Sequence, residues 1–329
     1  MTTQSIQLLK SLQYPNGLFA AASKHVSTGY HRAWIKDNIY EAMAFEQTDE
    51  KTALRTYHKI LDILLKNEYK IDWMIVQPQP KEAYRYIHAR YDPNGEEVLE
   101  PWGNKQNQMI GLLLFKIGDL ARKGITVLRN QDDKRIVQKL VHYLEAIEYW
   151  HDADNGEWEE AEEIHASSIG ACIAGLQSIK ETVHVPEELI EKGRKALNEL
   201  LPRESKTKEC DMAQLALIWP LNVVNEKQRD AILRRIEEKL VRNKGVIRYT
   251  SDKYYSNSKE AEWPLGLAWL AVIYKQLNVE NKYRFYLRKT EEAMNLKKEI
   301  PELYFGETST HNENTPLGWA QALYVLAAK

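Results

Sequence analysis

Apolar residues return every three or four positions along most of the chain, and this spacing predicts helices almost throughout. The clearest example lies in residues 51–70, where one helical face collects Leu54, Tyr57, Ile60, Leu61, Leu64 and Leu65. The pattern predicts about twelve helices in total, at residues 3–13, 31–46, 51–70, 104–123, 133–150, 165–181, 186–201, 211–224, 226–241, 264–277, 281–297 and 315–328.

Turn and breaker residues separate these segments. Pro15-Asn16-Gly17 ends the first helix, and Pro220 is expected to end or kink a helix near Trp219. Residues 71–103 form the least regular stretch and read as a long loop, which in a compact domain tends to be functional. Residues 246–249 show strand character within the loop 245–263.

The predicted helices alternate in composition. Four runs are apolar nearly all round and should be buried, at residues 109–120, 211–224, 264–274 and 317–328. The runs at 51–70, 133–150, 187–200, 226–241 and 281–297 carry one charged face and should lie outside. This alternation predicts an all-α (α/α)6 toroid, with about six inner and six outer helices in a single domain, 1–329. A superhelical stack of repeats would show a recurring consensus, and we find none.

Composition narrows the class of protein. The chain has 329 residues, 43% hydrophobic and 28% charged, with a formal net charge of −2, which is typical of a soluble globular protein. A near-neutral charge argues against nucleic acid as a partner, and no run approaches the roughly 18 apolar residues of a membrane span. The start of the chain lacks a signal region, and two cysteines make no disulfide framework, so we expect a cytoplasmic protein.

The aromatic composition is unusual, because the chain has 9 Trp and 18 Tyr but only 5 Phe. Rings with a polar edge suit surfaces that are apolar on one side and wet on the other. A carbohydrate-binding cleft is one such surface, although a Tyr-rich helical core would have a similar composition.

The stretch from Asn155 to Ser168 carries the most chemistry. An Asn-Gly turn leads into Trp158, Glu159 and Glu160, and a helix follows. An aromatic ring beside paired carboxylates suits sugar chemistry, because the ring covers the apolar face of a pyranose and excludes water. Exclusion of water raises the pKa of a carboxyl group, which can then act as a general acid. The alternative is an acidic turn that caps a helix. A metal cluster is not expected, because consecutive Glu residues of a helix point in different directions.

The loops also differ in length. Those before residues 36, 104, 165, 264 and 315 are long and hold most of the candidate residues, whereas the reverse connections are short. In a helical toroid the loops that enter the inner helices lie at one end, so we expect these residues on one face.

Five segments taken in order resemble motifs of the glucoamylase family (glycoside hydrolase family 15). The resemblance covers nearly the whole chain and is closest to the branch that contains the glucoamylase-like domain of phosphorylase kinase α and β subunits. Each motif is weak alone, but their order and spacing are specific. The segments are Trp34-Ile35-Lys36-Asp37, Glu100-Pro101-Trp102-Gly103-Asn104-Lys105-Gln106, Gly156-Glu157-Trp158-Glu159-Glu160, Arg248-Tyr249 with Tyr254-Tyr255, and Ile300-Pro301-Glu302 with Leu317-Gly318-Trp319.

The resemblance implies an activity and a role for each matching residue. The activity is inverting hydrolysis that removes glucose from the non-reducing end of an α-glucan or maltooligosaccharide, without a cofactor or metal. Glu159 would be the general acid and Glu302 the general base. The substrate-binding residues would be Trp34, Lys36, Asp37, Trp102, Gln106, Trp158, Glu160, Arg248 and Trp319.

Two departures from the family pattern keep a second hypothesis open. Lys36 stands where the family usually has Arg, and Lys cannot make a planar two-pronged contact. Gln108 stands where an Asp is common, which removes a negative charge that would favour a protonated acid. The alternative is therefore a weakly active or inactive glucan-binding module. Glu307 and Glu313 are rival bases, and the linkage of the glucan and the oligomeric state stay open.

Overall fold

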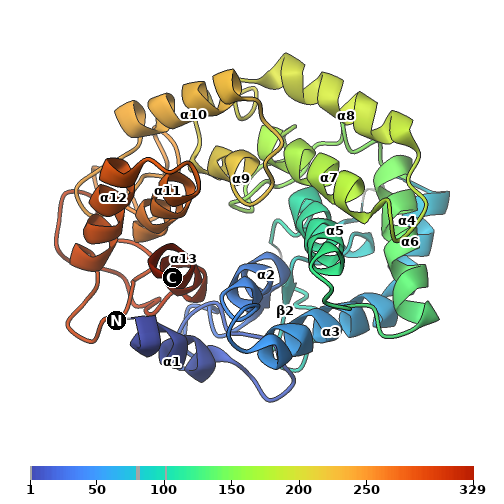
Figure 1. The fold of residues 1–329 in the computed structure, drawn as a ribbon, viewed down its shortest axis with the longest axis horizontal. Coiled ribbons are helices and arrows are strands. Elements are labelled where there is room, and N and C mark those ends of the chain that lie inside the picture. Colours follow the sequence, from blue (N-terminus) through green and yellow to red (C-terminus); the bar gives the residue numbers. More distant parts are fainter. Residues whose placement is uncertain (1, 79–81, 101) are drawn as a thin grey trace. The chain divides into compact units, whose positions relative to one another are not determined.

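The computed structural model describes residues 2–78, 82–100 and 102–329 (Figure 1). Within these ranges the chain forms thirteen α-helices, two short 3₁₀ helices and two strands of two residues each. Pro101 of the Trp102 motif lies outside the described residues, as do Met1 of the predicted domain and residues 79–81 of the predicted loop.

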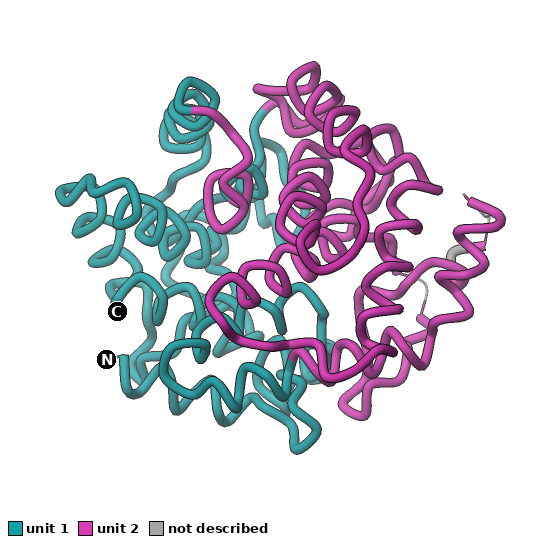
Figure 2. The backbone as a smooth tube through the Cα atoms, turned by 45° about the vertical axis from the view of Figure 1, so that its right-hand side comes forward, with its two compact units in different colours: residues 1–56, 210–215, 226–329 teal, residues 57–209, 216–225 magenta. Residues whose placement is uncertain are grey.

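The chain divides into two compact units (Figure 2). Unit 1 contains residues 1–56, 210–215 and 226–329, and unit 2 contains residues 57–209 and 216–225. The chain therefore leaves unit 1 twice and returns to it twice. The single domain 1–329 stays a prediction.

Unit 1 holds both ends of the described chain. Its elements are α1 (Thr2–Leu12), β1 (Ala33–Trp34), α2 (Ile35–Met43), the first turns of α3 (Glu50–Lys66), η2 (Met212–Gln214), α10 (Glu226–Lys239), α11 (Pro264–Gln276), α12 (Glu280–Glu292) and α13 (Gly318–Ala328). All nine residues of α2 are buried, and α13 packs against α1, α2 and α11. The burial of α11 and α13 confirms the prediction that the apolar runs at 264–274 and 317–328 lie inside.

Unit 2 contains most of the remaining helices. Its elements are the rest of α3, α4 (Glu68–Val76), η1 (Ala83–Arg85), β2 (Arg90–Tyr91), α5 (Asn107–Arg122), α6 (Gln131–Ala146), α7 (Ala166–Ile179), α8 (Glu187–Leu200) and most of α9 (Leu215–Ile218). The start of α6 shows how local sequence sets a boundary, because the Asn130 side chain accepts hydrogen bonds from the backbone N–H groups of Asp132 and Asp133.

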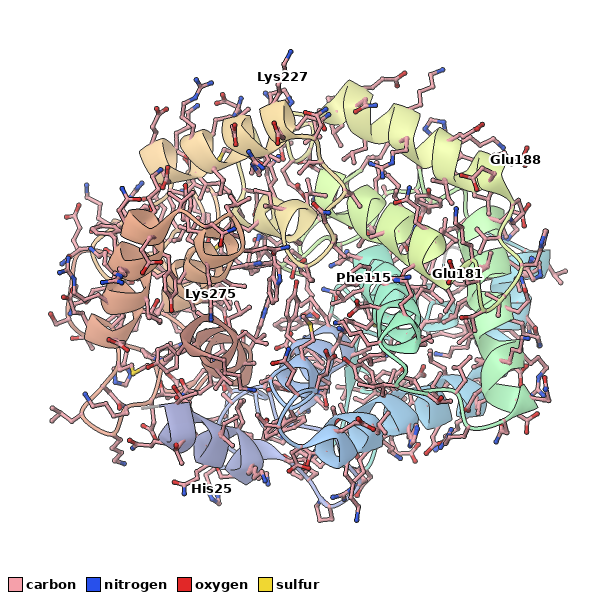
Figure 3. The ribbon with its side chains drawn as sticks, viewed as in Figure 1. His25, Phe115, Glu181, Glu188, Lys227 and Lys275 are labelled. Atoms are coloured by element: carbon pink, nitrogen blue, oxygen red, sulfur yellow. The ribbon has the colours of Figure 1, made fainter. Side chains whose placement is uncertain are left out.

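Helices α5 and α7 form the most extensive helix contact among the described residues of unit 2 (Figure 1). Glycines make this approach possible, because a Cβ atom at Gly175 would lie 2.4 Å from the carbonyl oxygen of Gly111. Both helices are almost wholly buried, as predicted for the run at 109–120. The amphipathic helices keep their charged faces exposed, and Glu188 of α8 and Lys227 of α10 point outward from their ribbons in Figure 3.

Two predictions about local structure are wrong, and a third is confirmed only in part. The helix predicted at 51–70 breaks at Asn67, and α4 then continues to Val76 inside the predicted loop. The helix predicted at 211–224 is a 3₁₀ turn followed by the single turn α9, because Pro220 has no N–H to continue it. Residues 246–249 form only isolated bridges, with partners Val241, Trp263 and Asp211.

Two further observations concern the sequence expectations. Among the described residues, every helix is too short or too polar to cross a membrane. Cys172 and Cys210 are both buried free thiols.

Candidate active site

The residues predicted to form the site divide between the two units. Unit 2 holds Trp102, Gln106, Trp158, Glu159 and Glu160, and unit 1 holds Trp34, Lys36, Asp37, Arg248, Glu302 and Trp319. The expectation that all of them share one face stays a prediction.

In unit 2, a closed loop carries the predicted acid. The backbones of Asp154 and Glu163 exchange two hydrogen bonds of 2.9 Å and so fix both ends of the loop. The side chain of Asn155 spans it, accepting from Lys105 N at 2.9 Å and donating to Glu160 O at 2.7 Å. Glu159 itself has a positive φ of 58°, which only a tightly held backbone sustains in a residue other than glycine.

Trp102 and Glu159 lie in direct contact. The Trp102 indole Nε1–H donates a hydrogen bond to Glu159 Oε2. The indole is 45% exposed, and the Arg90 guanidinium lies 4.6 Å from its ring centroid. The two motifs also pack closely through their backbones, because a Cβ at Gly103 would come within 2.8 Å of the Glu159 carbonyl oxygen. A half-exposed ring therefore orients a carboxylate that solvent or ligand can reach.

The other unit 2 residues mostly support the loop. Gln106 occupies the N-cap position of α5, is buried, and donates from its side chain to the Gly156 carbonyl oxygen at 3.0 Å. Glu160 forms an ion pair with Lys208 at 2.6 Å, a partner that nothing in the sequence pattern indicated. Trp158 is half-buried on the same turn. The side-chain contacts of Gln106 and Glu160 thus stabilise the turn that carries Glu159.

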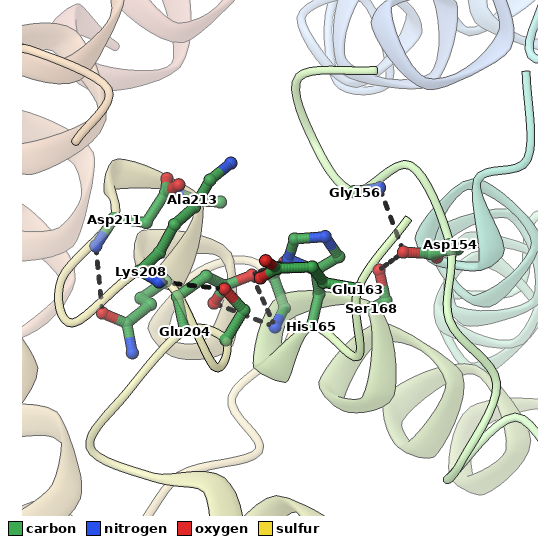
Figure 4. Close-up of polar contacts among 12 residues, drawn as sticks. Asp154, Gly156, Glu163, His165, Ser168, Glu204, Lys208, Asp211 and Ala213 are labelled. Carbon is green, nitrogen blue, oxygen red and sulfur yellow. Dashed lines mark hydrogen bonds and ion pairs between the residues drawn. The ribbon is translucent and has the colours of Figure 1, made fainter. Parts of the chain in front are cut away.

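A buried charged network lies at the foot of this loop (Figure 4). Asp154 accepts from Asn107 N at 2.8 Å, Gly156 N at 3.0 Å and the Ser168 hydroxyl at 3.1 Å. Burial raises the pKa of Asp154 to about 6, although these donors and the His165 charge oppose the rise. His165 Nδ1 lies 3.4 Å from Glu204.

The ring of His165 is charged at neutral pH. Burial disfavours its charged form, but the Glu204 hydrogen bond and the charges of Asp154 and Glu204 outweigh burial and raise its pKa to about 9. The Ser168 hydroxyl oxygen also lies 3.0 Å from Gln108 Oε1, so its single proton is shared between Asp154 and Gln108. The carboxyl of Asp154 thus shares a hydrogen-bond donor with Gln108, the position at which the family pattern has an Asp.

In unit 1, three predicted binding residues lie at the start of α2, with Trp34 at the N-cap position and Lys36 and Asp37 in the first turn. Trp34, Lys36 and Asp37 are all buried, with 5–7% of each residue exposed. Lys36 Nζ lies 4.0 Å from Asp37 Oδ1 and 4.4 Å from the centroid of the Trp319 ring. Trp319 in turn stacks on Tyr40 at 4.9 Å. The contact of α2 with α13 therefore joins the first predicted motif to the last.

Glu302 is fully buried and surrounded by donors. Asn314 Nδ2 donates to its Oε2 at 2.7 Å, and Asn312 Nδ2 donates to the same oxygen. The Tyr254 hydroxyl donates to Oε1 at 3.3 Å, and the Tyr30 hydroxyl, 3.0 Å from that of Tyr254, also bonds the carboxylate. Burial raises the pKa of Glu302 above its usual value, and these donors limit the rise.

Most of these donors escaped the sequence analysis. Tyr254 belonged to a recognised motif, but Tyr30, Asn312 and Asn314 did not. Asn312 and Asn314 alternate across Glu313 near Glu302, a spacing that offered a weak signal. Tyr30 lies 272 positions from Glu302 along the chain, so no local pattern connects the two.

The rival bases have very different surroundings. Glu307 is 68% exposed at its side chain and faces Lys259 at 3.3 Å. Glu313 is also exposed. Neither is enclosed as Glu302 is.

Arg248 is held rigidly. Its guanidinium makes two 2.6 Å bonds to Asp252 and lies 4.8 Å from the Tyr254 ring centroid and 5.4 Å from that of Trp263. The same Tyr254 bonds Glu302, so Arg248 supports a ring that contacts the predicted base. Across the described ranges, no group of three or more His, Cys, Asp or Glu side chains is arranged to hold a metal ion.

Comparison with known proteins gives the same family over the whole chain. A family model described as "Glycosyl hydrolases family 15" matches residues 1–327. A relative from Caenorhabditis elegans, "Probable phosphorylase b kinase regulatory subunit alpha", is 26% identical over 89% of this chain and 30% of its own length. The chain thus spans about a third of the length of the curated relatives that it matches.

Solved structures match over almost the full length. A glycosidase variant in complex with glucose superposes with a TM-score of 0.83 at 18% identity, covering 99% of this chain and 95% of its own. A bacterial glucoamylase complexed with acarbose gives 0.72 at 16% identity, covering 98% of this chain and 53% of its own. The fold class predicted from the sequence, an all-α (α/α)6 toroid, is confirmed by this match.

Proposed function

Because the chain belongs to glycosyl hydrolase family 15, we propose that it is an inverting, exo-acting hydrolase that releases glucose from the non-reducing end of α-glucans or maltooligosaccharides. Glu159 is the general acid in this proposal and Glu302 the general base. Lys36, Asp37, Arg248 and the aromatic residues of the motifs position the terminal sugar.

The observation that carries the proposal is the contact between Trp102 and Glu159. A half-exposed ring provides a face for a pyranose, and its N–H fixes the carboxyl that would protonate the glycosidic oxygen. The enclosed setting of Glu302 supports its role as the base, because Tyr30, Tyr254 and the two asparagines hold its oxygens in a defined orientation.

The proposed reaction balances as a single displacement. Glu159 gives its proton to the glycosidic oxygen, and the bond from that oxygen to C1 breaks. Glu302 takes a proton from a water molecule, whose oxygen attacks C1 from the opposite face. Inversion requires the two carboxyls to lie roughly 6.5–9.5 Å apart so that this water fits, and this separation is part of the proposal. The first product is β-glucose.

A second candidate is a glucan-binding regulatory module with little or no turnover. The relatives named phosphorylase b kinase regulatory subunit alpha favour it, as does Lys36, whose ammonium lies over the Trp319 ring. A Lys at this position offers a point charge in place of a planar fork.

A measurement of turnover distinguishes the hydrolase from the regulatory module. Glucose release from maltose, maltotriose, isomaltose and trehalose would be measured for the native chain, Glu159→Gln and Glu302→Gln. We expect turnover by the native chain, β-glucose as the first product by NMR, and at least a hundredfold loss of kcat in each variant.

Three other outcomes would redirect the assignment. Turnover that survives Glu302→Gln would move the base to Glu307 or Glu313. An α-glucose first product would exclude inversion. The regulatory module would replace the hydrolase if no sugar is cleaved but calorimetry detects maltooligosaccharide binding that Trp102→Ala removes.

A further inference from the structure

A concave surface lies in unit 2 beside the Trp102 motif, where α4 meets the segments around 84–88, 97–100 and 102–104. It is a cavity of about 620 Å³, within the range of about 300–1,000 Å³ typical of ligand sites. Its lining comes from Tyr69, Lys70, Trp73, Tyr84, His88, Glu97, Leu99, Glu100, Trp102 and Asn104. None of these except Trp102 belongs to the proposed site.

The rim of this cavity is aromatic and exposed. Tyr69 and Trp73 stand one turn apart on α4 with their rings 4.9 Å apart, edge to face. The exposed fractions are 46% for Tyr69, 47% for Trp73, 53% for Tyr84 and 45% for Trp102. Four large rings gathered around one hollow are unusual on a protein surface and indicate a binding site.

The floor of the cavity is polar, and two of its buried atoms lack a hydrogen-bond partner among the described residues. Lys70 and Glu97 form a buried ion pair at 2.6 Å through Glu97 Oε2. Among the described residues, Glu97 Oε1 and His88 Nε2 have no hydrogen-bond partner, although both are shielded from solvent and His88 is only 5% exposed. Unpaired buried acceptors of this kind are costly unless a ligand supplies the donors.

The two unpaired atoms, Glu97 Oε1 and His88 Nε2, are both hydrogen-bond acceptors. Burial and the nearby Lys70 charge lower the pKa of His88 to about 4, so the ring is neutral at pH 7. The ring bonds the backbone of Val98 through its other nitrogen, which leaves Nε2 as an acceptor. Together with Glu97 Oε1, the floor offers acceptors to hydroxyl groups beneath a rim of aromatic faces.

We propose that this cavity, which we call the outer aromatic site, binds glucose units of a linear α-glucan away from the bond that is cleaved. Rings that stack on the apolar face of a pyranose, above acceptors for its hydroxyls, match the chemistry of a sugar chain.

Trp102 connects this site to the proposed chemistry. Its ring lines the outer aromatic site, while its N–H bonds Glu159. A glucan with its end at Glu159 would therefore have its following units beside the aromatic rim. The contribution to turnover rests on the proposed function, but the binding itself does not.

The test uses β-cyclodextrin, a ring of α-linked glucose units. Because it has no non-reducing end, an exo-acting site cannot cleave it, and calorimetry reports binding alone. We expect the native chain to bind it, and Trp73→Ala and Tyr84→Ala each to weaken binding at least tenfold. Phe285→Ala is the matched control, because Phe285 is 43% exposed on α12 and is not part of the cavity.

A second measurement tests the role in turnover. The ratio of kcat/KM for maltoheptaose to kcat/KM for maltose should fall about tenfold in Trp73→Ala, because only the longer substrate reaches the outer aromatic site. Absence of β-cyclodextrin binding in the native chain would overturn the proposal, as would binding that Trp73→Ala and Tyr84→Ala leave unchanged. Binding that depends on Trp73, in a chain without turnover on any sugar, would support this site and count against the hydrolase.

Discussion

At the scale of single residues, the two glutamates proposed as acid and base have different surroundings. Glu159 is half-buried on a closed loop and accepts a hydrogen bond from the Trp102 indole, whereas Glu302 is fully buried among hydroxyl and amide donors. The surroundings therefore distinguish the two carboxyls more than their sequence motifs do. Tyr30, a residue outside every recognised motif, contributes directly to the setting of Glu302.

This contact predicts a shift in the pH profile. In Tyr30→Phe, Glu302 loses a donor that stabilises its charged form, so its pKa should rise further. A base must be deprotonated, so the acidic limb of the kcat/KM profile should move to higher pH by about one pH unit, given about 1.5 kcal/mol for a hydrogen bond to a charged group. The profile would be measured on maltose from pH 3.5 to 8.

Tyr283→Phe is the control, because its hydroxyl donates to the Ala327 carbonyl at 3.2 Å in the same unit and faces no carboxylate in the proposed site. An acidic limb at the same pH in Tyr30→Phe and the native chain would contradict the assignment of Glu302 as the base.

At the scale of elements, α7 links the packing of unit 2 to its candidate site. The helix begins directly after His165, at the end of the loop that carries Glu159. It also packs against α5. The glycines at this contact allow the two backbones to touch, which fixes the position from which the loop departs.

This close packing predicts a large cost for a small change. In Gly175→Ala, the added methyl would lie 2.4 Å from the Gly111 carbonyl oxygen, so the helices must separate. We expect the free energy of unfolding to fall by about 3 kcal/mol, at the upper end for overpacking. Urea denaturation followed by circular dichroism would measure the change.

Gly124→Ala provides the comparison. Nothing lies within 4 Å of the added atom, and only the positive φ of 80° opposes the substitution. Its cost should be about 1 kcal/mol. Equal losses in the two variants would mean that backbone conformation, and not helix contact, explains the glycine at position 175.

At the scale of the whole molecule, the buried network of Asp154, His165 and Glu204 makes stability depend on pH. The pKa of His165 is raised from 6.5 to about 9 in the folded chain. A raised pKa contributes stability that is fully present below pH 6.5 and is lost as the pH rises through 9. The native chain should therefore lose stability between pH 7 and 9.5.

Glu204→Gln tests this link. Removing the carboxylate beside a buried charged ring should lower the free energy of unfolding at pH 7 by roughly 3 kcal/mol, and should flatten its dependence on pH between 7 and 9.5. Glu280→Gln breaks an exposed pair with Arg284, and should change stability by less than about 0.5 kcal/mol. Parallel stability curves for Glu204→Gln and the native chain would show that the network does not set this dependence.

Several features of the fold follow from the sequence for simple physical reasons. Helices α5, α11 and α13 are buried because their residues are apolar all round, and any helix of that composition must leave water. Pro220 ends α9 wherever the helix packs, because the missing N–H is a property of the residue. The break at Asn67 was not predictable, because the apolar spacing of 51–70 continues smoothly across it.

The sequence by itself determined the fold class, the family and the motif residues of the candidate site, because apolar spacing and motif order can be read directly from the chain. Only the tertiary structure showed that Trp102 bonds Glu159, that Lys208 pairs with Glu160, and that Tyr30 reaches Glu302. It alone gathered Trp73, Tyr84 and His88 around one cavity. These contacts join residues distant along the chain, and hydrogen bonds and shared burial depend on distances that only folding sets.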